Sequence, residues 1–186
     1  MPTLDWVDKV EKEREEEQAK GYFNFVEGDN RFQLLTHCAQ LIQRWNGQKY
    51  EVVIEGDSKE GRSIKGVCYV LQDDEIKVAY LPYTVVKQIR ALQNDPDWTF
   101  SDFPMPRMIN VKAKGAGTKE VEYSVIPSPK ESKVSQETLE KLSKKHTPEQ
   151  IVEIMKEKRA GKNTKKVVEK SIEYPKEEIN PEDIPF

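Results

Sequence analysis

The feature that most constrains this chain is a series of short alternating segments between Tyr22 and Ile126. In Tyr50–Glu55 and Glu75–Leu81 the apolar side chains fall on every second position, which is the period of a half-buried β-strand. Turn signals such as Gly56-Asp57 and Asp73-Asp74 separate the segments. This arrangement predicts a small, mainly β domain built from several short strands.

One helical segment interrupts the predicted strands. Apolar residues between Thr84 and Asn94 recur at the spacing of a single helix face, so we predict a helix there. Short strands with one inserted helix are typical of a small closed or partly open barrel, for which the OB-fold is the leading candidate. An SH3-like barrel or an α+β roll fits the bare pattern almost as well. The other strands are expected at Arg31–Thr36, Ser63–Gln72, Met108–Lys114 and Glu120–Ile126.

Composition divides the chain into four parts. We predict a charged helix in residues 1–20 and the β domain in residues 21–129, closed by Pro127-Ser128-Pro129. Residues 130–161 are expected to form short basic helices, because Ser135 and Thr147 stand where helix N-caps are needed. Residues 162–186 have little apolar content before their end and are expected to be a flexible linker with an acidic tip.

Charge is distributed unevenly along the chain, whose formal net charge is −3. Residues 1–20 carry −3, residues 21–128 carry −1, residues 129–170 carry +5 and residues 171–186 carry −4. A phosphate backbone responds to local clusters of cations, because charges are screened beyond roughly 8–10 Å. The acidic total is therefore compatible with a nucleic-acid ligand, and the basic stretch is a candidate for part of the phosphate contact.

Side chains that carry metal or catalytic chemistry are sparse. Cys38 and Cys68 show no metal-ligand spacing, and His37 and His146 lie far apart in sequence. We expect reduced thiols, no metal, no cofactor and no enzymatic activity, since no phosphate loop or nucleophile–base signature is present either. No apolar run is long enough for a membrane span, and the acidic start lacks a signal-peptide core, so we expect a cytoplasmic protein without membrane partners.

Three stretches of the β domain together resemble one family. Tyr22-Phe23-Asn24-Phe25 followed by Glu27-Gly28-Asp29-Asn30-Arg31-Phe32 resembles its first strand, and Val85–Trp98, ending in Asn94-Asp95-Pro96-Asp97-Trp98, resembles its helix. Ile109–Pro129 resembles its final hairpin. In this order and spacing they are similar to the phage-type single-stranded-DNA-binding proteins, over a little more than half the chain. The resemblance implies an OB-fold barrel that binds single-stranded DNA.

A second resemblance lies at the chain end. Pro181-Glu182 followed by Asp183, Ile184, Pro185 and Phe186 is similar to the acidic C-terminal tip of bacterial single-stranded-DNA-binding proteins. In that family the tip docks on helicases, nucleases, polymerase subunits and recombination mediators. The residue types fit such a role, because a terminal phenylalanine offers a ring and a free carboxylate to one basic pocket. Proline lowers the ordering cost of binding, and the acidic residues favour a basic rim.

Binding of single strands without sequence preference needs cations along the phosphates and aromatic faces on which bases stack. Trp45 is the strongest stacking candidate, because it is expected in a polar loop beside Arg44, and Tyr69 follows, because Lys65 shares its strand face. Tyr50 and Tyr80 alternate in step with the apolar residues of their strands, so a role in core packing is as consistent with the sequence as a role in base stacking. The predicted DNA-binding residues are Arg31, Arg44, Trp45, Lys49, Tyr50, Lys65, Tyr69, Lys77, Tyr80, Lys112 and Lys114.

Together these interpretations predict a protein that coats exposed DNA strands in replication, recombination or repair and recruits partner enzymes through Asp183–Phe186. If it is phage-encoded, it would act in the cytoplasm of a bacterial host. The alternative is an adaptor whose barrel binds protein and has no affinity for nucleic acid. RNA binding is a lesser variant, because no RNA-type motif is present.

Overall fold

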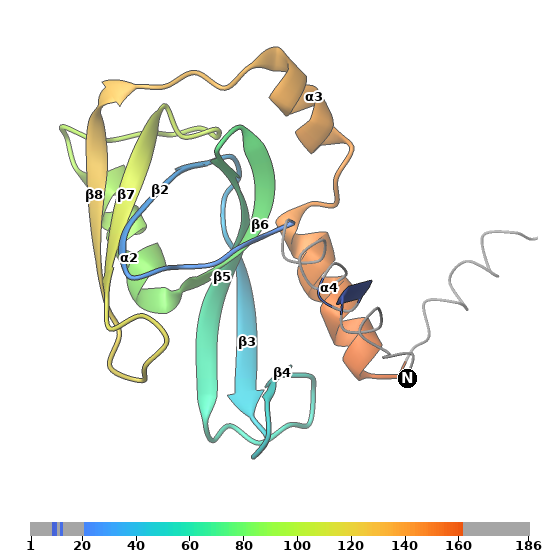
Figure 1. Ribbon diagram of the computed structural model, residues 1–186. Helices are drawn as coiled ribbons and strands as arrows, with labels where there is room; N and C mark the ends of the chain where they lie inside the picture. Colours follow the sequence, from blue (N-terminus) through green and yellow to red (C-terminus); the bar gives the residue numbers. More distant parts are fainter. Residues whose placement is uncertain (1–8, 11, 13–20, 162–186) are drawn as a thin grey trace, which may run out of the picture.

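In the computed structural model, which describes residues 9, 10, 12 and 21–161, the protein is mainly β (Figure 1). Eight strands of the described chain form one open, mixed sheet in the order β1-β6-β5-β2-β7-β8, and β3 joins it by pairing with β5 and β4. The sheet is mixed because β1 runs parallel to β6. The strands are β1 (Tyr22–Phe23), β2 (Gly28–Leu34), β3 (Ala39–Trp45), β4 (Tyr50–Val52), β5 (Arg62–Gln72), β6 (Glu75–Pro82), β7 (Arg107–Lys114) and β8 (Glu122–Glu131).

The β5–β6 hairpin is the clearest agreement between sequence and structure. Both strands begin and end within one residue of the predicted segments, and their register runs without a break from Gln72↔Glu75 to Lys65↔Pro82. Asp73 and Asp74 form the turn with φ values of 51° and 61°. Two consecutive positive φ angles match the tight hairpin turn whose twist fits the flanking strands.

Strand β3 was not predicted, and the Arg44-Trp45 pair therefore lies on a strand and not in a loop. β2 and β3 pair with successive parts of the same strand, β5. Leu34 of β2 pairs with Val70, and Ala39 of β3 pairs with Val67. The predicted strand at Tyr50–Glu55 is reduced to the three residues of β4. Alternation was hard to see in β3 because Ile42, Gln43 and Arg44 are all half-buried, so neither face reads as apolar.

The helices follow their sequence signals closely. α2 (Tyr83–Asn94) occupies the predicted helical segment, α3 (Gln136–Ser143) is capped by Ser135, and α4 (Pro148–Arg159) begins in a complete capping box between Thr147 and Gln150. β8 runs through Pro127 and ends at Glu131, beyond the proline pair that was expected to close the domain.

Two separate apolar clusters hold the described chain together. The larger lies between the sheet and α2 and includes Phe32, Leu34, Val70, Leu81, Val85 and Ile109, each at most 1% exposed. The smaller lies between α4 and the β3–β5 face, where Val152 meets Ala39, Leu41, Val52 and Val67. No residue of α4 belongs to the larger cluster. The β domain thus has a core of its own, and α4 is a separate layer on one face.

Gly66 of β5 permits the close approach of α2 to the sheet. A Cβ atom at this position would lie 2.7 Å from Cγ2 of Val86 and 3.0 Å from Cβ of Cys38. We expect Gly66→Ala to lower the free energy of unfolding by about 1–3 kcal/mol through overpacking, as measured by urea denaturation. Gly21→Ala is the matched control, because a Cβ there meets nothing within 4 Å; an equal loss in both variants would contradict the steric explanation.

Several predictions fall outside the described residues. These are most of the N-terminal helix of residues 1–20 and the whole of residues 162–186, including the acidic tip. In the described part of the chain, no helix is both long and apolar enough to cross a membrane. Cys38 and Cys68 are both free thiols.

Candidate nucleic-acid interface

Trp45 and Tyr50 form an exposed aromatic pair at the ends of β3 and β4. They are register partners, their ring centroids lie 5.2 Å apart in an edge-to-face arrangement, and they are 52% and 54% exposed. The connecting turn is held by Asn46, whose Oδ1 accepts hydrogen bonds from the backbone N–H groups of Gln48 and Lys49 at 2.9 Å. Figure 1 shows this end of the sheet extending beyond the rest of the domain. Both rings are thus fixed in place while their faces remain available.

A cation accompanies the two rings. Nζ of Lys65 lies 5.9 Å from the ring centroid of Tyr50, within the range of a cation–π contact. Lys49 is exposed in the adjoining turn. We call Trp45, Lys49, Tyr50 and Lys65 the stacking surface. All four were predicted from the sequence, and the structure brings them together from three strands and one turn.

Arg44 does not join this surface, although the sequence grouped it with Trp45. Its guanidinium lies 3.4 Å from Glu51 and 3.8 Å from Asp57. Arg159 of α4 contacts the same two carboxylates, with Nε 3.1 Å from Glu51. The hydrogen bond from Arg159 and a second from the backbone N–H of Ile54 hold the pKa of Asp57 below its usual value. The carboxylate therefore stays ionised at neutral pH, and Arg44 is part of a structural ion-pair network.

Tyr69 and Tyr80 differ from the prediction in another way. Tyr69 is only 5% exposed, so it offers no free ring face to a base and is a packing residue in this structure. Tyr80 is half-buried beneath α4, where its hydroxyl lies 3.8 Å from Sδ of Met155. Burial raises the pKa of both phenols, so they are neutral at physiological pH. Parity along the strand could not reveal the burial of Tyr80, because that burial comes from a helix about seventy residues later.

The remaining predicted cations lie elsewhere on the sheet. Lys77 donates a hydrogen bond to Gln72 across the β5–β6 hairpin at 3.1 Å. Arg31, Lys112 and Lys114 are exposed on β2 and β7, where Arg31 pairs in register with Asn110 and lines a cavity of about 280 Å³. Lys112 and Lys114 have Asp29 and Glu122 as register partners, which offsets their charge. Arg31, Lys112 and Lys114 share one face of the paired β2 and β7, which is separate from the stacking surface.

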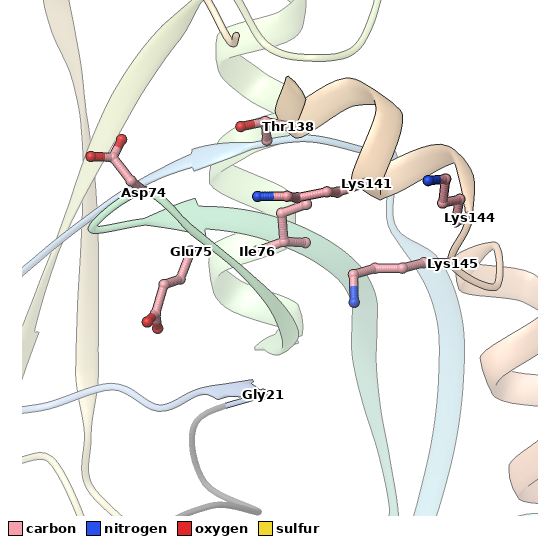
Figure 2. A pocket seen from close by; sticks show the side chains of 8 residues that line it. All are labelled: Gly21, Asp74, Glu75, Ile76, Thr138, Lys141, Lys144 and Lys145. Carbon is pink, nitrogen blue, oxygen red and sulfur yellow. The ribbon is translucent and has the colours of Figure 1, made fainter. Parts of the chain in front are cut away.

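A groove between α3 and the β5–β6 hairpin brings three lysines together, Lys141, Lys144 and Lys145. Its volume is about 630 Å³, and Figure 2 shows the side chains of Lys141, on α3, and Lys145, just after α3, extending toward the hairpin. We call it the lysine groove; it is lined by Gly21, Asp74, Glu75, Ile76, Thr138, Lys141, Lys144 and Lys145. The excess of basic residues after residue 129 pointed to this part of the chain, but only the fold identifies which lysines converge. Glu137 engages Lys141 at 2.6 Å, and no ion pair engages Lys144 or Lys145 within the described residues.

No protein-family model, no curated protein and no solved structure matches this chain. The described residues also contain no group of three histidine, cysteine or acidic side chains placed to hold a metal ion.

Proposed function

We propose that this protein binds single-stranded DNA, and that the stacking surface is where bases are held. The observation that carries the proposal is the exposed pair of Trp45 and Tyr50 with Lys65 at its edge. Two half-exposed aromatic rings in contact form a contiguous apolar patch, and such patches on a protein surface often mark binding sites. Base stacking on such rings is worth about 1–3 kcal/mol per base and tolerates any sequence.

The strand pairing supports an OB-type barrel as the framework. A long bent segment, β2 followed by β3, pairs with β5, which forms a hairpin with β6; α2 then leads to β7, which returns to pair with β2. This order is the one expected of a Greek-key barrel with an inserted helix. The sheet is open, since β8 pairs only with β7 among the described strands, so the barrel that we propose is a partly open one. OB-type barrels use such strand faces and adjoining loops to bind oligonucleotides.

In this proposal the protein coats exposed strands during replication, recombination or repair, and keeps them unpaired. The resemblance of Asp183, Ile184, Pro185 and Phe186 to the tip of bacterial single-stranded-DNA-binding proteins adds a second role, the recruitment of processing enzymes. The tip would enter a basic pocket through its terminal ring and carboxylate.

The acidic end also leads to a prediction about DNA affinity. Residues 171–186 carry −4 and follow a stretch of +5, so the tail can compete with phosphates for the same lysines. Deleting Asp183–Phe186 is expected to tighten binding to oligo-dT at low salt by about two- to tenfold, measured by fluorescence titration. The gain should shrink as salt is raised, and a deletion variant that binds as the intact chain does at low salt would contradict the competition.

The experiment that tests the proposed function is a fluorescence titration of the intact protein with oligo-dT, with duplex DNA as the control, at two salt concentrations. We expect quenching that favours the single strand and weakens with salt, because stacking and counterion release both contribute. An oligo-rU competitor separates DNA from RNA preference. Absence of binding at low salt, in both the intact protein and the tail deletion, would favour the adaptor alternative.

A further inference from the structure

The stacking surface and the lysine groove lie on one line along β6. Ile76 lines the lysine groove, Val78 and Tyr80 pack beneath α4, and Pro82 pairs in register with Lys65 of the stacking surface. These positions are two residues apart, so their side chains fall on one face of the strand. At about 3.3 Å per residue, the line from Ile76 to Pro82 is about 20 Å long.

α4 occupies the middle of that line. Val152 is 5% exposed between the helix and the sheet, and Ile151 and Met155 pack beside it on the β3–β5–β6 face. Figure 1 shows α4 extending from the neighbourhood of α3 toward the β3–β4 end of the sheet. Beneath it lies Tyr80, whose ring stacks on Tyr22 with centroids 6.2 Å apart. The covered face therefore carries the same kind of side chain as the exposed stacking surface.

The contacts that attach α4 to the sheet can be broken without unfolding the β domain. Its apolar contact is narrow and is separate from the core of the β domain. At its start, Glu149 pairs with His37, and both side chains are more than half exposed. At its end, Arg159 pairs with Glu51 and Asp57. Displacing α4 would leave the larger apolar cluster intact, because α4 contributes no residue to that cluster.

We propose that the single-strand site continues beneath α4, and that α4 is a displaceable cover over its central part. With the helix docked, a DNA strand can contact either the stacking surface or the lysine groove, but not both. With the helix released, a single DNA strand contacts Trp45, Tyr50 and Tyr80 and continues to Lys141 and Lys145. This inference rests on the proposed function and adds to it the path of the strand and the element that limits its length.

The substitution Arg159→Gln distinguishes a displaceable cover from a purely electrostatic effect, because the two predict opposite changes in DNA affinity. The substitution removes a positive charge and leaves Glu51 and Asp57 less neutralised, so electrostatics alone predicts weaker DNA binding. A cover predicts tighter binding, because the covered form no longer competes with the strand. We expect affinity for oligo-dT of roughly 16 nucleotides to rise by about three- to tenfold, and affinity for a strand of roughly 4 nucleotides to change far less.

Two further variants make the test specific to the docking of α4. Val152→Gln removes the central apolar contact without changing charge and is expected to act in the same direction as Arg159→Gln. Glu157→Gln, on the exposed side of α4, is the control, and should give only the small gain that follows from losing one negative charge. Circular dichroism of each variant verifies that the β domain is folded.

Hydrogen exchange of the intact protein supplies an independent readout. Adding the longer strand is expected to reduce amide protection in residues 148–159 while β5 and β6 stay protected; the shorter strand leaves α4 protected. If the intact protein binds DNA but Arg159→Gln weakens binding and α4 keeps its protection, the inference is wrong and the proposed function stands. If neither the intact protein nor any variant binds a single strand, the proposed function itself fails.

Discussion

Replacing Trp45 with alanine is expected to weaken binding of oligo-dT by about 5- to 150-fold, the equivalent of one stacked base at about 1–3 kcal/mol. The side chain is 52% exposed and its removal opens no cavity in either apolar cluster. The loss should therefore appear in affinity and leave the urea midpoint nearly unchanged. Fluorescence anisotropy of a labelled strand measures the effect without depending on tryptophan emission.

Tyr83 provides a matched control for this substitution. It is 55% exposed, close to the value for Trp45, but it begins α2 and is not part of the stacking surface. We expect Tyr83→Ala to bind oligo-dT as the unmodified protein does. Trp45→Phe should keep part of the affinity, because a smaller ring still stacks. Equal binding by Trp45→Ala and the unmodified protein would remove the main support for the proposed function.

The Trp45 and Tyr50 substitutions are expected to be non-additive. The two rings touch edge to face, so removing either one alters the support of the other. Tyr50 also holds Lys65 beside the surface through the cation–π contact. A Tyr50→Ala variant should therefore lose a stacking face and also weaken the salt dependence of binding, because the lysine is less well placed. The double variant should lose less than the sum of the two single losses.

How far the sequence predicts this site depends on what surrounds each residue. Trp45 was recognised because it stands beside Arg44 in a stretch that was expected to be a polar loop. Tyr50 was equally consistent with packing, and only the pairing of β3 with β4 places its ring against Trp45. Arg44 was assigned to DNA because its neighbour is Trp45. Its ion pairs with Glu51 and Asp57 depend on how β3 and β4 are paired, which local patterns do not encode.

The same distinction explains the fold. Hairpins such as β5–β6 and capped helices such as α4 were predicted because their signals lie within a few residues. β3 was missed because Ile42, Gln43 and Arg44 are half-buried at three consecutive positions, and this removes the alternation that identifies a half-exposed strand. The covering of Tyr80 by α4 is a contact between residues far apart in the chain, so it becomes visible only in the assembled structure.

Phe32→Ala is expected to lower the stability of the β domain strongly. Phe32 is fully buried, contacts Phe23 at a centroid distance of 4.7 Å and pairs in register with Ile109. Truncating a buried phenylalanine leaves a cavity in addition to the lost burial, and costs about 3–5 kcal/mol of unfolding free energy. Urea denaturation followed by circular dichroism measures it, and Ile126→Ala, at an exposed position of β8, is the control with an expected change within about 0.5 kcal/mol.

This substitution also separates the core from the interface. Phe32 belongs to the larger apolar cluster, whereas the stacking surface lies on β3, β4 and β5 beyond it. Under conditions in which Phe32→Ala remains folded, its affinity for oligo-dT should therefore equal that of the unmodified protein. A large loss of affinity in the folded variant would mean that the packing of β2 against β7 sets the position of Trp45, and the binding site could then no longer be treated as a local property of the β3–β4 turn.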